Sequence, residues 1–159
     1  MKNLGDLLKR LTEHKVQYVL VGGYAAAAHG ATLVTQDVDI CFRFSVANLM
    51  RLQKALADLH PVHRLTPQRL PLLLTPKACK GLKNLYISTD GGILDCLGNI
   101  AGIGDYASVR QQSESIDLGF GPIRMLTLDS LIKAKEAMNR PRDREAVIQL
   151  KAVRERKGG

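Results

Sequence analysis

The spacing of hydrophobic residues predicts a succession of helices and strands in the first part of the chain. Leucines at helical spacing predict an amphipathic helix over residues 3–14, and a short apolar run predicts a strand over residues 18–21. A glycine pair follows, and then an alanine-rich helix over residues 24–29 that Gly30 closes. Alternating polar and apolar residues predict a second strand over residues 37–44, after which helical spacing resumes.

Prolines and glycines interrupt the middle of the chain. Four prolines predict irregular structure between residues 61 and 80, apart from a short regular piece around residues 72–74. Two runs of strand-forming residues are joined by the sequence Asp-Gly-Gly at residues 90–92, which suits the positive φ of a tight turn. These runs predict an antiparallel hairpin over residues 85–98.

The last part of the chain predicts one more strand and two helices. The strand lies near residues 123–126, and a helix capped by Thr127 covers residues 128–139. Pro141 suits the first turn of a final helix. No repeat or linker divides the chain. The sequence therefore predicts an α/β (α+β) protein with a single domain over residues 1–159.

The composition excludes two classes of protein. With 45% hydrophobic and 24% charged residues, the chain is neither a disordered tail nor a membrane bundle. The most apolar stretch, residues 19–28, is far shorter than the ~20 residues that span a bilayer, and the charged N-terminus lacks the apolar core of a signal peptide. Three cysteines without disulfide or zinc-site spacing fit a reducing compartment. We expect a cytoplasmic protein with no membrane partner.

The net charge of +8 favours a polyanionic partner such as nucleic acid. This charge is unevenly distributed, because residues 59–89 contain no acidic side chain. Such a window is typical of an electropositive lip beside a site, and equally of a solvated loop whose charge only aids solubility. Its basic residues are Arg64, Arg69, Lys77, Lys80 and Lys83.

Asp37 and Asp39 are the first candidates for chemistry. They are two residues apart on a strand whose other face is apolar, so their carboxylates project from one side, roughly 6 to 7 Å apart at the backbone. Cys41 shares that face, which we expect to lie outside the core. Two like charges this close favour a bound cation, and their oxygens suit Mg²⁺ that bridges to substrate phosphates. An Asp-x-Asp alone is more often an exposed strand edge or a turn.

Gly22 and Gly23 lie at a predicted turn from strand to helix. Backbone amides and a helix N-terminus at such a turn form an anion site that suits a phosphate. The pair also has a plain structural interpretation as a tight turn that needs positive φ or close backbone approach. It is not a Walker A loop, because the Gly-Lys-Ser/Thr ending is absent.

Three charged residues occupy positions where apolar residues are expected. Asp95 is the lone charge in an apolar strand, either a metal ligand or general base or an edge residue that faces solvent. Lys135 and Asp143 lie on the buried stripes of the two last helices, where they are placed to pair with each other. Lys135 then either reaches a triphosphate, with Asp143 orienting it, or extends to solvent at the domain edge.

Two segments together resemble the DNA polymerase beta-like nucleotidyltransferases. The first is Val19-Leu-Val-Gly22-Gly23-Tyr-Ala…His29-Gly30…Thr35-Gln-Asp37-Val-Asp39-Ile, whose order and spacing are specific. The second, Leu131-Ile-Lys-Ala-Lys135…Arg140-Pro-Arg-Asp143, is similar to the C-terminal part of the minimal AbiEii-type branch, which includes toxins of toxin-antitoxin modules. The resemblance covers about residues 18–150.

The resemblance implies a fold and a site. The fold is a small mixed sheet flanked by helices, with a core over about residues 15–126 and C-terminal helices over about 127–157. The carboxylates hold Mg²⁺ or Mn²⁺, and the glycine pair cradles the nucleotide phosphates without the serine that the family often has there. The implied site residues are Asp37, Asp39 and Asp95 for catalysis and metal, with Asp95 as the candidate base, and Gly22, Gly23, Lys135 and Asp143 for the nucleotide.

The implied reaction is the transfer of a nucleoside monophosphate from a nucleoside triphosphate to an acceptor hydroxyl. Acceptors of three kinds stay open at this point: tRNA or another nucleic acid, a protein side chain, and a small hydroxylated molecule. An antitoxin protein is a further implied partner. The alternatives are a catalytically silent module of the same fold that binds nucleic acid or a protein, and a structural or antitoxin-type subunit whose apolar helix faces form an interface.

Overall fold

A computed structural model describes residues 3–33 and 35–158 of the chain. Its helices are α1 Leu4–Glu13, α2 Gly22–His29, α3 Val46–Leu56, α4 Pro76–Cys79, α5 Tyr106–Gln111, α6 Leu128–Met138 and α7 Pro141–Gly158, with a short 3₁₀ turn at Ala57–Leu59. Its strands are β1 Tyr18–Val21, β2 Asp37–Phe42, β3 Val62–His63, β4 Asn84–Thr89, β5 Gly92–Leu97, β6 Asn99–Ile100, β7 Gly104–Asp105, β8 Ser113–Asp117 and β9 Pro122–Leu126.

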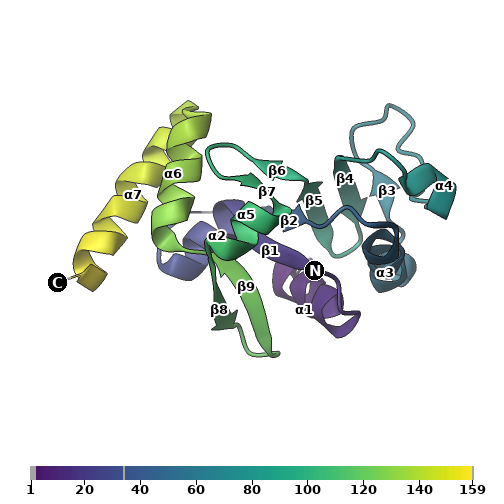
Figure 1. Ribbon diagram of the computed structural model, residues 1–159, viewed down its shortest axis with the longest axis horizontal. Coiled ribbons are helices and arrows are strands. Elements are labelled where there is room, and N and C mark those ends of the chain that lie inside the picture. Colours follow the sequence, from purple (N-terminus) through teal and green to yellow (C-terminus); the bar gives the residue numbers. More distant parts are fainter. Residues whose placement is uncertain (1–2, 34, 159) are drawn as a thin grey trace.

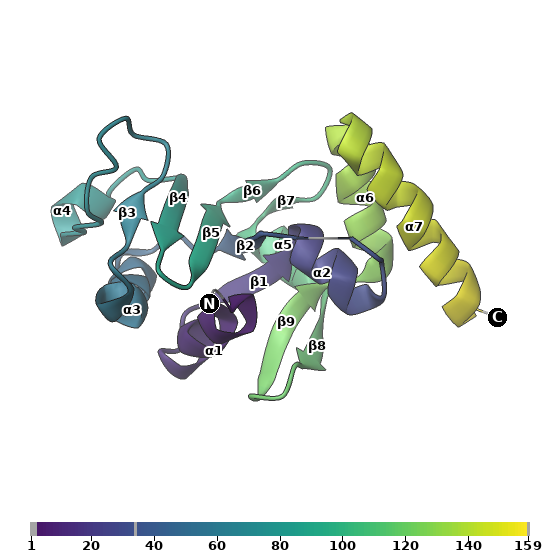
Figure 2. The same cartoon turned by 180° about the vertical axis from the view of Figure 1, so that it is seen from behind.

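A seven-stranded mixed sheet forms the centre of the molecule, in the order β3-β4-β5-β2-β1-β9-β8. The pairs β1 with β9 and β2 with β5 are parallel, and the other neighbours are antiparallel. Strands β6 and β7 form a small separate hairpin. Helices α6 and α7 lie at one end of the molecule and β3 with α4 at the opposite end, as both views show (Figures 1 and 2). The predicted mixed sheet with flanking and C-terminal helices is confirmed.

Local signals account for the ends of most elements. Helix α1 begins after Asn3, whose side chain accepts a hydrogen bond from the Asp6 N–H. Helix α2 ends at Gly30, which has the left-handed conformation, with φ 114°. Thr127 caps α6 as predicted, by accepting from the Ser130 N–H. The predicted hairpin forms as β4 and β5, and the Thr89 hydroxyl donates to the Gly92 carbonyl across the turn.

The segment between residues 61 and 80 is mostly irregular, as predicted, but the expected regular piece around residues 72–74 is wrong, because these residues form neither a helix nor a strand. Leu72 and Leu74 are nevertheless buried and anchor it to the core. Two elements in it are regular: β3 adds an edge strand beside β4, and Thr75 caps the single turn of α4.

Besides β3 and α4, the prediction missed four further elements, and it misplaced one residue. Helix α5 and strands β6, β7 and β8 are short and polar, so no apolar period marks them, and β8 forms only because β9 pairs with it. The expectation that the face carrying Cys41 lies outside the core is wrong at Cys41, which is fully buried. The reason is that α5 packs against β1 and β2 at that end of the face, which leaves only the Asp37 and Asp39 end open.

One cluster of buried side chains includes residues of α1, the sheet, α6 and α7. The three cysteines are free thiols and are buried. Across residues 3–33 and 35–158, every helix is too short or too polar to cross a bilayer.

Candidate active site

Four residues form a row across the sheet. In the strand register, Val21 of β1 is opposite Asp39 of β2, Asp39 is opposite Asp95 of β5, and Asp95 is opposite Tyr86 of β4. Side chains at opposed positions of neighbouring strands project from the same face of a sheet. Asp37 is two residues before Asp39, so its side chain projects from that face as well. The sheet therefore brings the three predicted carboxylates together.

Asp39 lies at the centre of this row, where its charge is poorly balanced. Burial raises the pKa of Asp39 to about 6, and the negative charges of Asp95 and Asp37 act in the same direction. The positive charges of Lys135 and Arg142 lower this pKa only in part. A cation beside Asp39 would relieve the repulsion among the three carboxylates.

Asp95 has a positively charged partner that lies close to it. Arg64 Nη2 donates to both carboxylate oxygens of Asp95, at 2.7 and 2.6 Å. The guanidinium also lies over the ring of Tyr86, 5.7 Å from its centroid. Arg64 belongs to the basic window over residues 59–89, so one member of that window reaches the carboxylates.

The glycine pair forms the first residues of α2 and lies against the carboxylate row. Gly22 has φ +74°, and a Cβ on it would lie only 2.7 Å from the Cβ of Asp39, so no side chain fits there. A Cβ on Gly23 would lie 3.2 Å from the Thr35 hydroxyl oxygen, which is tight. The N-terminus of α2 therefore lies directly beside Asp39, and its free N–H groups and helix dipole favour an anion at this place.

Lys135 and Asp143 form the predicted ion pair, with 3.6 Å between Nζ and Oδ1. Arg140 is a closer partner of Asp143: its Nε lies 2.5 Å from Oδ2, and its backbone N–H donates to the same oxygen. Burial raises the pKa of the fully buried Asp143, but the hydrogen bonds and charges of Arg140 and Lys135 lower it by more, so the net shift is downward. Asp143 thereby holds two cations in position at the turn between α6 and α7.

Two adjoining cavities, of about 610 and 400 Å³, lie over the carboxylate row. They share six lining residues, which are Asp39, Tyr86, Leu97, Lys135, Met138 and Arg140. Every predicted site residue except Asp143 lines one of them, and Asp143 lies behind Arg140 and Lys135. The larger cavity is lined by Gly23 of α2 and by the charged residues Asp37, Asp39, Asp95, Lys135, Arg140 and Arg142. The smaller cavity is lined by Gly22 of α2 and by the charged residues Asp39, Lys135 and Arg140.

The residues present fit a divalent cation in part. Carboxylate oxygens are the ligands that Mg²⁺ and Mn²⁺ prefer, and Asp37 and Asp39 offer them on one face, at the wall of the larger cavity. Over the described ranges 3–33 and 35–158, however, no three acidic, histidine or cysteine side chains are already arranged as a metal site. Asp95 is bound to Arg64 instead. The third carboxylate can join a metal site only if Arg64 moves away.

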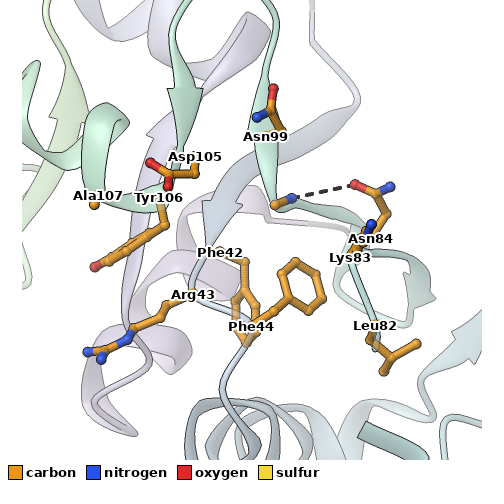
Figure 3. Close-up of a pocket in the computed structure, with 11 residues that line it drawn as sticks. Phe42, Arg43, Phe44, Leu82, Lys83, Asn84, Asn99, Asp105, Tyr106 and Ala107 are labelled. Carbon is orange, nitrogen blue, oxygen red and sulfur yellow. Dashed lines mark hydrogen bonds between the residues drawn. The ribbon is translucent and has the colours of Figure 1, made fainter. Parts of the chain in front are cut away.

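Another cavity, of about 570 Å³, contains none of the predicted site residues. Phe44, Tyr106 and Asn84 lie around it, and Arg43 and Lys83 add positive charge (Figure 3). Asn84 accepts a hydrogen bond from the Gly98 N–H at 3.5 Å on one side of this space. Size alone therefore does not single out the active site, and the carboxylates do.

Sequence reasoning did not assign a role in the site to four residues that line or approach the cavity. Arg64 was part of the basic window, and Arg140 and Arg142 belong to the quoted C-terminal segment, but nothing in the one-dimensional pattern shows what they contact. Tyr86 reads as an ordinary strand residue. Its place opposite Asp95 depends on the register of β4 with β5, which only the fold determines.

Comparison with known proteins gives matches among solved structures alone. No protein-family model and no curated protein matches the chain. The lincosamide antibiotic adenylyltransferase LnuA, solved with lincomycin bound, superposes with a TM-score of 0.62 at 16% identity, over 94% of this chain and 95% of LnuA. The chain has the nucleotidyltransferase fold. The finer resemblance to the AbiEii-type branch stays a prediction.

A second enzyme shares this nucleotidyltransferase fold. ANT(2'')-Ia in complex with adenylyl-2''-tobramycin superposes with a TM-score of 0.55 at 16% identity, over 97% of this chain and 96% of that one. The solution structure of ANT(2'')-Ia, described as an antibiotic-resistance factor, gives a TM-score of 0.52 at 17% identity, over 95% and 86% of the two chains. The similarity therefore covers most of this chain and most of each chain that is compared with it.

Proposed function

We propose that this protein is a metal-dependent nucleotidyltransferase, which moves a nucleoside monophosphate from a nucleoside triphosphate to an acceptor hydroxyl. The observation that carries the proposal is the convergence of Asp37, Asp39 and Asp95 with Lys135 and Arg140 over one cavity. Carboxylates opposite basic side chains are what a triphosphate and its cation require together. The likeness to solved adenylyltransferases supports the same activity.

Each group of residues has its own part in the proposed reaction. Lys135 and Arg140, held by the buried Asp143, bind the triphosphate by charge, and the N-terminus of α2 accepts one of its phosphate groups. Gly22 has no side chain, which lets Asp39 lie directly against this N-terminus. Asp37 and Asp39 would hold Mg²⁺ or Mn²⁺, which when bound offsets the negative charge of the phosphates and of the carboxylates.

The chemical step is a displacement at the α-phosphorus. The acceptor oxygen forms a bond to this phosphorus, the bond from the phosphorus to the bridging oxygen breaks, and pyrophosphate leaves with that oxygen. Asp95 takes the proton of the acceptor hydroxyl once its oxygens are free of Arg64. In this proposal the nucleotide lies beside Asp39, and the acceptor hydroxyl lies beside Asp95, which is opposite Asp39 in the sheet.

For the acceptor we propose a small hydroxylated molecule. The structures that share the fold contain lincomycin and adenylyl-2''-tobramycin, which are ligands of this kind. The cavities over the carboxylates, of about 610 and 400 Å³, are of the size that holds such ligands. Transfer to RNA or to protein, which would fit a toxin role, is the alternative. The labelling experiment distinguishes it from transfer to a small molecule.

The test is incubation with each α-labelled nucleoside triphosphate, Mg²⁺ or Mn²⁺, and a cell extract that has been divided into small-molecule, RNA and protein fractions. The matched control is the double variant Asp37→Ala/Asp39→Ala. We expect label in the small-molecule fraction with the wild type and none with the control. Label in RNA or protein that depends on the two carboxylates would keep the enzyme class and replace the acceptor. Label that moves equally with the control would contradict the proposal.

The second candidate is a catalytically silent module of the same fold that binds through its charge. The contact of Arg64 with Asp95 favours it, because a carboxylate held by a guanidinium is not free for metal or proton. Under this alternative no nucleotide supports transfer, and binding of a polyanion weakens steeply with salt but is unchanged in Asp37→Ala. Transfer that depends on Asp37 would exclude it.

A further inference from the structure

Arg64 is tied to two neighbouring strands at the edge of the carboxylate row. It follows directly after β3, and its backbone N–H donates to the Tyr86 carbonyl of β4 at 2.9 Å. Its side chain reaches one strand further, where Nη2 is bonded to both oxygens of Asp95 on β5. The side chains of Arg64 and Asp95 are only 24% and 12% exposed, so water screens this pair weakly.

The contact leaves part of the guanidinium unsatisfied. Arg64 Nε is buried and has no hydrogen-bond partner among the described residues. A buried donor without an acceptor opposes the arrangement that buries it. The backbone anchor of Arg64 is independent of its side chain, so the guanidinium can leave Asp95 by rotation while β3 stays paired.

Because of Arg64, the carboxylate of Asp95 has different neighbours from those of Asp37 and Asp39. Asp37 and Asp39 line the cavity and face the basic side chains of α6 and α7 across it. Asp95 directs both oxygens to a guanidinium, so a cation that binds Asp95 has to displace Arg64 from it. Within residues 3–33 and 35–158 no three-residue metal cluster is already arranged, although the register brings the three carboxylates together, and its salt bridge to Arg64 sets Asp95 apart from the other two.

We propose that Arg64 is a latch on the active site, which competes with the divalent cation for Asp95 and keeps the third carboxylate closed until the guanidinium rotates away. Asp37 and Asp39 then bind the cation first, and Asp95 binds it only after Arg64 has moved away. This inference rests on the proposed function, because it assumes that the carboxylates bind a divalent cation. Arg64 acts through Asp95, so it is a positioning residue.

The test measures Mn²⁺ binding directly, by the loss of the electron paramagnetic resonance signal of free Mn²⁺ on titration with protein and no nucleotide. The proteins are the wild type, Arg64→Ala, Asp95→Asn and the double variant. We expect Arg64→Ala to bind Mn²⁺ about tenfold more tightly than the wild type, a coupling within the usual range for groups in contact. In the Asp95→Asn background, removal of Arg64 should change the affinity little.

Two further variants distinguish the latch from a general effect of charge on Mn²⁺ affinity. Arg69→Gln removes a positive charge from an exposed position in the same segment and should leave Mn²⁺ affinity near the wild-type value. Arg64→Lys keeps the charge but not the planar fork, so its affinity should lie between those of the wild type and Arg64→Ala. It also serves in place of Arg64→Ala if thermal melting shows that the alanine variant is unfolded.

The outcomes distinguish failure of the latch proposal from failure of the nucleotidyltransferase proposal on which it rests. Equal Mn²⁺ affinity in the wild type and Arg64→Ala would overturn the latch and leave the nucleotidyltransferase proposal intact. The same gain with and without Asp95 would also overturn it, since the effect would then be one of overall charge. Mn²⁺ binding that is absent from every variant, Arg64→Ala included, would contradict the metal site on which both proposals rest.

Discussion

Asp39 and Asp95 lie directly opposite each other in the parallel pairing of β2 with β5, although they are far apart in the sequence. The pairing places two negative charges side by side in a half-buried position, and Asp37 adds a third from the same strand. A protein that buries like charges in this way loses stability unless a cation or a ligand compensates for them. Arg64 compensates the charge of Asp95 directly but not that of Asp39, so the position of Asp39 is better explained by ligand binding than by folding.

Gly22→Ala should disrupt both the fold and the site. A residue with φ +74° already strains any side chain, and here the new Cβ would also meet Asp39. We expect a loss of roughly 3 kcal/mol in the free energy of unfolding, from backbone strain together with overpacking. Urea titration measures this loss.

Gly81→Ala is the matched control for Gly22→Ala. Gly81 has a similar φ of +79°, but nothing lies near the position of its Cβ. It should cost only about 1 kcal/mol, from backbone strain alone. Equal losses in the two variants would mean that Gly22 makes no close contact with Asp39.

Lys135→Ala should weaken nucleotide binding without unfolding the protein. Lys135 lines both cavities, and its partner Asp143 keeps the closer contacts with Arg140 when the lysine is removed. We expect the Kd of a nucleoside triphosphate to rise about tenfold in equilibrium dialysis. Lys133→Ala, at an exposed position of the same helix, should leave the Kd unchanged. A Kd that shifts equally in both variants would mean that only net charge matters.

Asp143→Asn should destabilise the packing of α6 against α7. The carboxylate is fully buried and binds Arg140 and Lys135, so its removal leaves two cations without their partner. A loss of roughly 3 kcal/mol in the free energy of unfolding is expected from chemical denaturation. Asp129→Asn is the control, because the ion pair of Asp129 with Arg154 is largely exposed and contributes less than about 1 kcal/mol. A loss for Asp143→Asn no larger than that of the control would rule out this role.

The same carboxylate predicts a pH dependence of stability. The pKa of Asp143 in the folded protein lies below its ordinary value of 3.8, so above that value both the folded and the unfolded chain hold it ionised and its contribution is complete. As the pH falls below about 4, the unfolded chain takes up a proton that the folded chain does not, and the contribution is lost on passing through the folded pKa.

The measurement is the difference in unfolding free energy between wild type and Asp143→Asn over a range of pH. This difference should be constant from neutral pH down to about 5 and should shrink in more acidic buffer. A difference that stays constant down to pH 3, or that grows there, would show that the pKa of Asp143 is not lowered.

The sequence by itself determined the elements with strong local signals. Leucine spacing predicts α1, the alanine run that Gly30 terminates predicts most of α2, and the alternation around Asp37 and Asp39 predicts β2. The pairing of Lys135 with Asp143 was also predictable, because two charges on buried helical stripes must find partners. These features depend on neighbours within a few positions, so the order of residue types is enough to predict them.

Only the tertiary structure decided what meets in the site. The parallel pairing of β2 with β5 places Asp95 beside Asp39, and the antiparallel pairing of β4 places Tyr86 next in the row. The attachment of Arg64 to Asp95 depends on the pairing of the edge strand β3 with β4, and the burial of Cys41 depends on where α5 packs. Contacts between distant segments are fixed by strand register and packing, which no local pattern encodes.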